Sequence, residues 1–317
     1  MASLNARRFV ALLSPVDLVS IAFLLILTAL NIFFCARVEH WFVLIAVNLA
    51  AICAIFWLAW LAEEKRTRLL IGLHRWYCYL IILLIFKELY LMVHPIHPTD
   101  YDQLFIAIDR WMFGVNPTQW IGQFAHPVLT EILQIAYFSY YILFIILGVE
   151  IYRRYAIENF DKAAFLIVYG FYLSYIGYFS LPGIGPRFTL HDFSSLSTDL
   201  PGVFLTDLLR AIVNAGESIP QAHDHVMDVV QRDVFPSGHT ELTIIVMALG
   251  FRYRLNTRWL VLVLGSLLIL ATVYLRYHYV IDLIAGALLA WFTLWSGDRL
   301  EAWWRQTAQR LREQKLT

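Results

Sequence analysis

The sequence predicts an all-α membrane protein: a polytopic helix bundle of about eight transmembrane helices, with an interfacial helix and an outer capping loop. Of its 317 residues, 60% are hydrophobic and 15% are charged. A soluble globule of this length cannot bury that much apolar surface. Long apolar runs alternate with short charged turns along the chain. The protein is therefore expected to be integral to a membrane.

Eight segments are apolar over nearly the ~20 residues that a bilayer-spanning helix needs. They are residues 16–36, 41–62, 69–93, 127–151, 161–181, 238–252, 259–277 and 279–297. The sixth segment is short, as expected if it begins at a site within the membrane surface. No small-residue cleavage site accompanies the first segment, so we expect an uncleaved span and not a signal peptide.

Charge sets the expected orientation, because short cytoplasmic loops carry an excess of Lys and Arg. With the N-terminus inside, most of the 24 basic residues fall on the inner side, in segments such as 63–68, 152–162 and 299–315. The polar motifs described below then fall at the outer ends of their spans. We expect a site on the extracytoplasmic face, periplasmic or lumenal, and an inner-membrane location if the source is bacterial.

Two connecting segments on the outer side are expected to be structured. Residues 94–126 are amphipathic and rich in aromatic side chains, which is typical of a helix lying along the headgroups. Such a helix could roof an outer cavity, guide a lipid, or only anchor the chain. Residues 182–236 form a long polar loop with Gly/Pro turns and a short helix expected near 203–215. Loops of this length are usually functional or disordered, and we expect an ordered cap.

The second polar motif of the chain, Arg-Tyr-His-Tyr-Val-Ile-Asp, occupies residues 276–282. His278 and Asp282 are four residues apart, which on a helix places them on one face within hydrogen-bonding reach. A carboxylate that fixes one imidazole nitrogen leaves the other free to attack or to move a proton. Ionisable residues at membrane depth are functional candidates by default, although a lone membrane histidine is more often interfacial packing.

The first polar motif, Phe-Pro-Ser-Gly-His-Thr, occupies residues 235–240. Proline suits the first turn of a helix, and the unpaired N–H groups of Ser237, Gly238 and His239 can point at an anion. This pattern predicts a phosphate cradle with a histidine beside it. Two histidines in two matched patterns favour a site over packing.

These motifs resemble those of the type 2 phosphatidic acid phosphatase superfamily, which contains histidine-dependent membrane phosphatases and lipid phosphotransferases. The family pattern is Lys-x6-Arg-Pro, then Pro-Ser-Gly-His, then Ser-Arg-x5-His-x3-Asp. The second motif is complete at residues 236–239. In the third motif His278 and Asp282 match, whereas Ala271 and Thr272 stand at the Ser-Arg positions. The resemblance covers roughly residues 160–297.

The arginines and the lysine of the family pattern have only partial counterparts. Arg276 is the arginine nearest to the third motif and, one helical turn closer to the histidine, is expected to face the same way. The first motif is reduced to Gly-Pro-Arg-Phe around Arg187, with Ser180 where the lysine belongs. Lys87 is the best candidate to replace that lysine, although a structural ion pair with Glu88 is the alternative. These departures move the resemblance toward the branch of inositol phosphorylceramide and sphingomyelin synthases.

The resemblance implies metal-independent phosphoryl transfer from a lipid phosphoester or pyrophosphate. His278 is then the expected nucleophile, forming a phosphohistidine, and Asp282 orients it. His239 is the expected general acid for the leaving alcohol and afterwards the base that activates the acceptor. The residues expected to hold the phosphate oxygens are Arg187, Ser237, Gly238, Arg276 and Lys87. Neither a metal nor another cofactor is expected.

Several functional alternatives remain open at this point. Water as the acceptor makes a lipid phosphatase, and a hydroxyl acceptor makes a phosphotransferase resembling inositol phosphorylceramide or sphingomyelin synthase. A non-catalytic lipid-binding protein on the same scaffold is disfavoured because both histidines are present. A metal-dependent hydrolase would use His223, Asp224, His225, Asp228 and Asp233, although a solvated loop is the favoured reading.

The expected partners are a lipid phosphate substrate and membrane lipids. The net charge is zero, so nothing points to nucleic acid, and no pattern indicates an oligomeric state. The expected division is an N-terminal three-span region with the interfacial helix (1–126), a catalytic phosphatase/phosphotransferase core (127–298) and a basic membrane-surface tail (299–317).

Overall fold

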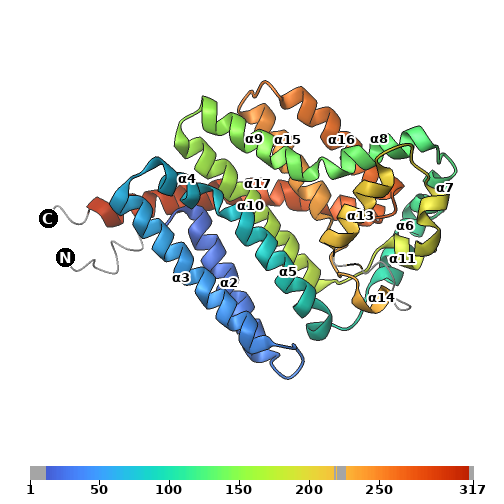
Figure 1. Cartoon of the computed structure of the whole chain (residues 1–317), viewed down its shortest axis with the longest axis horizontal. Coiled ribbons are helices and arrows are strands. Elements are labelled where there is room, and N and C mark those ends of the chain that lie inside the picture. Colours follow the sequence, from blue (N-terminus) through green and yellow to red (C-terminus); the bar gives the residue numbers. More distant parts are fainter. Residues whose placement is uncertain (1–11, 218, 220–225, 314–317) are drawn as a thin grey trace. The chain divides into compact units, whose positions relative to one another are not determined.

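In the computed structural model, residues 12–217, 219 and 226–313 are described, and every regular element among them is a helix (Figure 1). This confirms the all-α class. The chain divides into two compact units. Unit 1 comprises Met1–Ile96, Tyr155–Tyr172 and Phe292–Thr317, and unit 2 comprises His97–Arg154 and Leu173–Trp291.

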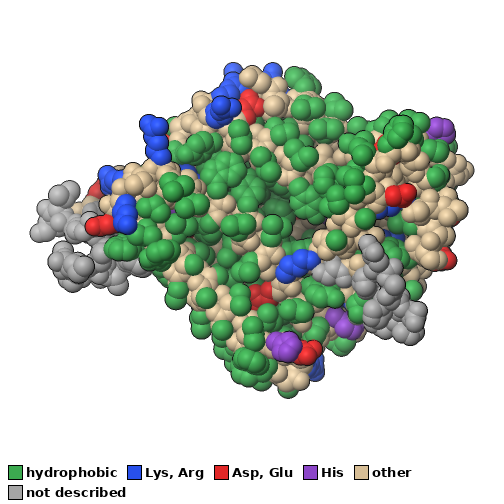
Figure 2. Space-filling view, viewed as in Figure 1, with side chains coloured by type: hydrophobic (Ala, Val, Ile, Leu, Met, Phe, Trp, Pro, Cys, Tyr) green, Lys and Arg blue, Asp and Glu red, His purple; other side chains and the backbone are tan. Residues whose placement is uncertain are grey.

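Several helices are long and apolar enough to cross a membrane, which confirms the polytopic helical architecture. Within the described residues they are α2 (Pro15–Phe33), α3 (Trp41–Lys65), α4 (Arg68–Trp76) continued by α5 (Cys78–Ile96), α10 (Ile157–Ser180) and α17 (Val280–Glu313). Hydrophobic side chains cover much of the face seen in Figure 2, as expected for helices that meet lipid.

The expected count of eight spans is not confirmed. Helices α8 (Pro127–Phe138) and α9 (Tyr140–Arg154) together pass the length and hydropathy test, but they are bent by 48° at the break between them. Helices α15 (Gly238–Arg252) and α16 (Arg258–Tyr274) have 15 and 17 residues. Both are shorter than the ~20 residues that cross a bilayer without tilt. The described residues thus hold five such helices, or six with the bent pair.

Unit 1 is built around the hairpin of α2 and α3, with α5 also packed against α2 (Figure 1). Helix α2 starts at a capping box, in which Ser14 Oγ accepts from the Asp17 N–H and Asp17 Oδ2 accepts from the Ser14 N–H. Such a box satisfies two N–H groups that the first turn leaves unpaired. The C-terminal part of α17 belongs to this unit, where Trp304 is buried and donates to the Leu13 carbonyl oxygen at 3.0 Å. The segment expected to be a basic tail is thus continuous with α17 as far as Glu313.

Unit 2 contains α6 (Asp102–Phe113), α7 (Pro117–Gly122), α8, α9, α15, α16 and the first part of α17. Helix α16 lies beside α8, and α15 packs against both α16 and α9. The long loop after α10 contains several short helical elements among its described residues. It holds α11 (Pro186–Thr189), a 3-10 turn (Phe193–Ser195), α12 (Leu196–Asp199), α13 (Thr206–Gly216) and α14 (Val226–Val229).

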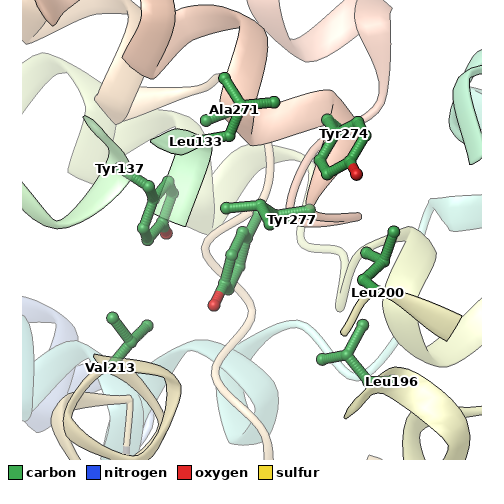
Figure 3. Close-up of a cluster of buried hydrophobic side chains, with 9 residues drawn as sticks. Leu133, Tyr137, Leu196, Leu200, Val213, Ala271, Tyr274 and Tyr277 are labelled. Atoms are coloured by element: carbon green, nitrogen blue, oxygen red, sulfur yellow. The ribbon is translucent and has the colours of Figure 1, made fainter. Parts of the chain in front are cut away.

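The cap is tied to the bundle by a buried apolar cluster (Figure 3). Leu196, Leu200 and Val213 of the cap belong to the same cluster as Tyr137 of α8 and Tyr277, which follows α16. Burial of such side chains contributes about 1.5–3 kcal/mol each. The cluster therefore holds the cap directly beside the segment of residues 276–282.

Two helices of unit 2 begin at a carboxylate supplied by another helix. Glu131 of α8 accepts hydrogen bonds from the N–H groups of residues 203–206, at the start of α13. Glu150 of α9 accepts from the N–H groups of Asn256 and Thr257, at the start of α16. Because the first N–H groups of a helix have no partner within it, these carboxylates fix where α13 and α16 begin.

Candidate active site

The two motif histidines lie next to each other in unit 2. His239 is the second residue of α15, and His278 directly precedes the turn that starts α17. His278 Nε2 lies 3.4 Å from His239 Nδ1, and the ring planes meet at 61°. The structure thus brings both imidazoles to one point at the start of two helices.

The protonation state of His278 follows from its contacts. Its Nδ1 lies 2.9 Å from the carbonyl oxygen of Val234 and 3.4 Å from Asp282 Oδ2. A carbonyl oxygen only accepts, so Nδ1 carries the proton and Nε2 presents a lone pair toward His239. Burial, together with the nearby His239 and Arg187, holds the pKa of His278 well below its usual range. The ring is therefore neutral at physiological pH.

His278 reaches this position through a turn and not through a helix. Helix α16 ends at Tyr274, and Arg276 has a left-handed backbone with φ of 68°. The N–H groups of Tyr277 and His278 both donate to the Thr272 carbonyl oxygen. Arg276 therefore lies in a turn and not on a helix as its expected orientation assumed, because the chain reverses between α16 and α17.

The Asp282 carboxylate makes two contacts in this turn. Its Oδ2 accepts from the Tyr279 N–H at 2.8 Å and also faces His278 Nδ1. It is fully buried, in the first turn of α17. The contact expected from the four-residue spacing is therefore made across the start of the helix.

The Pro-Ser-Gly-His loop is bound to the same turn. The Ser237 N–H, expected to face an anion, instead donates to the Asp282 carbonyl oxygen at 3.0 Å. Ser237 Oγ caps α15 by accepting from the Thr240 N–H at 3.2 Å. A Cβ on Gly286 would lie 2.5 Å from the Ser237 carbonyl oxygen, so only glycine there lets α17 approach the Pro-Ser-Gly-His loop this closely. The backbone donors left for an anion are the N–H groups of Gly238 and His239.

Arg187 reaches the site from the cap. Its backbone N–H donates to the Arg276 carbonyl oxygen at 3.0 Å, and its guanidinium lies over the Tyr277 ring, 4.6 Å from the centroid. The guanidinium donates through Nη2 to Glu217 at the end of α13. Its Nη1 is buried without a hydrogen-bond acceptor. A buried guanidinium donor without a partner is costly, so this group is suited to receive an anion.

Arg276 lies in the same part of unit 2. Its Nη1 donates to Asp199 Oδ2 at 2.8 Å, and its Nε is buried without an acceptor. This hydrogen bond, with one from Ser195, lowers the pKa of Asp199, which stays ionised. Both motif arginines are therefore paired with a cap carboxylate while each keeps one buried donor unsatisfied.

Two tyrosines, one at the end of α8 and one at the start of α9, pack against His239. The Tyr137 ring is stacked on it, with centroids 4.8 Å apart, and the Tyr140 centroid lies at 4.4 Å. The break between α8 and α9 falls between these two residues. Tyr137 is also stacked on Tyr277, at 4.2 Å (Figure 3). Tyrosines three residues apart within an apolar segment were the signal that the sequence offered for this role.

Helix α6 contributes two buried carboxylates that sequence reasoning missed. Asp109 accepts from the N–H groups of Val280 and Ile281, both at 2.9 Å, and thereby caps α17. Burial raises the pKa of Asp109, although these two hydrogen bonds oppose the shift. The aromatic residues of 94–126 indicated an interfacial helix and gave no sign of these carboxylates. The available signal was the seven-residue spacing of Asp102 and Asp109, which places both on one face of α6.

Asp102 links α6 to the segment before Arg187. It accepts from the N–H groups of Ile184 and Gly185, at 3.0 and 2.8 Å, and from the Tyr279 hydroxyl at 2.8 Å. Gly185 has φ of 96°, a conformation that favours glycine. Helix α6 therefore holds both the loop of Arg187 and the turn that follows His278.

The remaining candidates are Lys87 and the loop residues considered as metal ligands. Lys87 is on the exposed side of α5 in unit 1, and the expected ion pair with Glu88 is absent, because Glu88 is buried and bound by asparagines. A phosphate-binding role for Lys87 stays a prediction. Of the loop acids and histidines considered as metal ligands, His223, Asp224 and His225 lie outside the described residues.

Comparison with known proteins gives one match. A family model described as the PAP2 superfamily matches residues 103–296, which is more than half of the chain. The matched range includes both motif histidines, the cap and most of α6. No curated protein and no solved structure matches.

Proposed function

Because the chain belongs to the PAP2 superfamily, we propose that it is a membrane lipid phosphate phosphatase acting through a phosphohistidine on His278. Membership of the superfamily supports a phosphatase-type activity in general. The observation that carries the specific proposal is the pair of imidazoles, in which the Nε2 lone pair of His278 faces His239 at 3.4 Å while the Val234 carbonyl holds Nδ1–H.

In the first step His278 Nε2 attacks the phosphorus atom of a lipid phosphoester or pyrophosphate. The bond from nitrogen to phosphorus forms and the bond from phosphorus to the leaving oxygen breaks. His239, protonated when the anionic substrate is bound, gives its proton to that oxygen. Asp282 stabilises the positive charge that develops on His278.

In the second step the phosphoryl group moves from His278 to the acceptor. His239 takes a proton from water, the oxygen of which attacks the phosphorus atom. The bond from phosphorus to Nε2 then breaks and inorganic phosphate leaves. His239 is protonated again and His278 neutral, so both groups return to the state in which the first step began.

The substrate-free geometry requires a rearrangement before this reaction. A phosphorus atom in line between the nucleophile and a donor to the leaving oxygen needs about 6 Å between the two nitrogen atoms. The observed separation is 3.4 Å. His239 is partly exposed whereas His278 is buried, so we expect the His239 ring to move and His278 to stay.

The phosphate oxygens are assigned to the donors that lack partners. These are Arg187 Nη1, Arg276 Nε and the N–H groups of Gly238 and His239. Planar guanidinium groups suit a tetrahedral anion because several donors act at once. The loop of Ser237 supports this set through its cap on α15. We place this site on the extracytoplasmic face, on the basis of the charge distribution of the loops.

The alternative is transfer to a lipid or inositol hydroxyl in place of water. Ser180 stands where the family's lysine belongs, and the third motif has the His-Tyr-x-x-Asp form of the phosphorylceramide synthase branch. The chemistry at phosphorus is the same, and only the acceptor oxygen differs.

The test uses the purified full chain with a panel of ³²P-labelled lipid phosphates and pyrophosphates, with and without inositol or ceramide. A phosphatase releases label as inorganic phosphate, whereas a transferase places it on a second lipid or on inositol. Acid-labile, base-stable label on wild-type protein but not on the His278→Gln variant is expected for a phosphohistidine. Turnover in His278→Gln at the wild-type rate would contradict the assignment.

A further inference from the structure

Unit 1 contains a buried polar cluster that the proposed chemistry does not use. Asn31 of α2, Asn48 of α3 and Glu88 of α5 are all at most 4% exposed, and each lies within a membrane-spanning helix. Helix α2 packs against both α3 and α5. Three polar side chains from three spans therefore meet in an apolar interior, where each costs free energy unless it is satisfied.

The hydrogen bonds of this cluster satisfy the two amide nitrogens and one carboxylate oxygen, but not the other three oxygens. Glu88 Oε1 accepts from Asn31 Nδ2 at 3.0 Å and from Asn48 Nδ2 at 2.8 Å. Asn31 Nδ2 also donates to the Leu27 carbonyl oxygen and contacts Met92 Sδ. By contrast Glu88 Oε2, Asn31 Oδ1 and Asn48 Oδ1 are buried without any donor. The cluster therefore lacks positive charge or donors on the side of these three oxygens.

The three unsatisfied oxygens belong to groups that share one neighbour, Glu88 Oε1. Both amide nitrogens contact the same carboxylate oxygen, and an amide oxygen is about 2.3 Å from its own nitrogen, so all three oxygens lie within roughly 5 Å of Glu88 Oε1. Carboxylate and amide oxygens are hard ligands that suit hard cations. No lysine or arginine in the described part of the chain forms an ion pair with Glu88.

We propose that Asn31, Asn48 and Glu88 bind a monovalent alkali cation within unit 1. The three side chains carry one negative charge, so a monovalent ion makes the cluster neutral, whereas a divalent ion would leave a buried positive charge. A proton on Glu88 Oε2 can be donated to only one of the two amide oxygens and leaves the other unsatisfied. A cation can be coordinated by several oxygens at once, and it is therefore the occupant that the number of unsatisfied acceptors favours.

This site does not depend on the proposed phosphatase activity, and its test does not use turnover. Purified full chain in detergent is titrated with NaCl or KCl against choline chloride at constant ionic strength, and the unfolding midpoint is recorded. A specific ion bound at ten times its Kd should raise Tm by about 2–4 °C above choline. In parallel, ²²Na⁺ binding is measured by scintillation proximity on the same protein.

Two variants of unit 1 make the test specific. Glu88→Gln removes the charge but keeps the size, and it should abolish both the alkali-specific rise in Tm and ²²Na⁺ binding. Asp17→Asn is the matched control, since Asp17 is also fully buried but is satisfied by Ser14, His74 and Tyr77. It should keep both responses, even if its Tm is lower.

Other results overturn the proposal. Equal Tm values in choline, sodium and potassium would show that no alkali ion binds. An alkali response that persists in Glu88→Gln would place the ion elsewhere. Sensitivity to pH alone, lost in Glu88→Gln, would show that the occupant is a proton. If Glu88→Gln fails to fold, equal Tm values together with no ²²Na⁺ binding in the wild-type protein would still overturn the proposal.

Discussion

Helices α17 and α13 start in the same way but carry different chemistry. Asp109 accepts from two N–H groups at the start of α17, and Glu131 accepts from four N–H groups at the start of α13. In both cases a carboxylate from another helix accepts from N–H groups at the start of the helix. His278 precedes α17 by two residues, whereas α13 holds no residue proposed to react.

The difference teaches how to separate folding from positioning in this site. Both carboxylates fix the first turn of a helix and should contribute similarly to stability. Only Asp109 caps the helix that carries Asp282 and directly follows His278, the two residues proposed to react. Variants of the two caps should therefore have similar effects on unfolding and different effects on turnover.

The largest expected effect tests whether the turn before α17 presents the nucleophile. His278→Gln should lower kcat by at least about 10⁴-fold, because no intermediate can form on the amide. His239→Gln should lower kcat by about 10²–10⁴-fold through loss of proton transfer. Initial rates with a labelled lipid phosphate measure both. Circular dichroism should show wild-type helix content, and an active His278→Gln would remove the reason to distinguish α17 from α13.

A smaller effect is expected when Asp109, the carboxylate that caps α17, is replaced. Asp109→Asn replaces one accepting oxygen by a donor, so one N–H of α17 loses its partner. We expect kcat to fall about 10- to 100-fold with little change in KM, because misplacement of a reacting group acts on the chemical step. The variant's kcat and KM are measured separately on the same lipid phosphate.

Glu131→Gln is the matched control for that variant. It should lower Tm by a few degrees, as Asp109→Asn does, since a lost cap costs about 1 kcal/mol. Its kcat should stay within about threefold of wild type. Equal losses of kcat in the two variants would mean that Asp109 acts only through stability.

Helix α13 has its own link to the site through its C-terminal end. Glu217 holds Arg187, so Glu217→Gln should free the guanidinium for substrate and lower KM about two- to fivefold with kcat nearly unchanged. Asp207→Asn is the control, because Asp207 is on the same helix with its side chain 80% exposed. Steady-state kinetics compare them, and an increased KM in Glu217→Gln would show that this carboxylate supports binding.

The smallest effect concerns the pH dependence of stability, through His191 in the capping loop. Burial, and then the charge of Arg276, lower the pKa of His191 to about 4 from its ordinary 6.5. Between these two pKa values His191 is protonated in the unfolded chain but not in the folded chain. The free energy of unfolding therefore falls as pH drops from about 6.5 toward 4. His191→Gln should reduce this slope in unfolding midpoints recorded over that range. An unchanged slope would assign it to other groups.

The parts of the site that depend on residues close together in the chain could be predicted from the sequence. The spacing of His278 and Asp282 and the Pro-Ser-Gly-His run place the imidazoles at the starts of two helices, and the structure brings those starts together. Patterns of this kind depend on neighbours in the chain, which periodicity reveals. The all-helical membrane class followed from composition for the same reason.

The long-range part could not be predicted in this way. Asp109 lies 171 residues from Val280, and Glu217 lies 30 residues from Arg187, so neither contact leaves a periodic signal. The turn at Arg276 was taken for a helix because a left-handed residue has no marker when it is not glycine. The bend between α8 and α9 likewise falls inside a continuous apolar run, in which hydropathy alone indicates a single straight span.

The 48° bend between α8 and α9 has a consequence for how the protein senses its surroundings. The two tyrosines on either side of it pack against His239, the proposed proton donor, so the bend angle affects how this ring is oriented. Bilayer thickness acts on the tilt of embedded helices. Turnover should therefore vary with the acyl chain length of the host lipid, even when the substrate and its concentration are held constant.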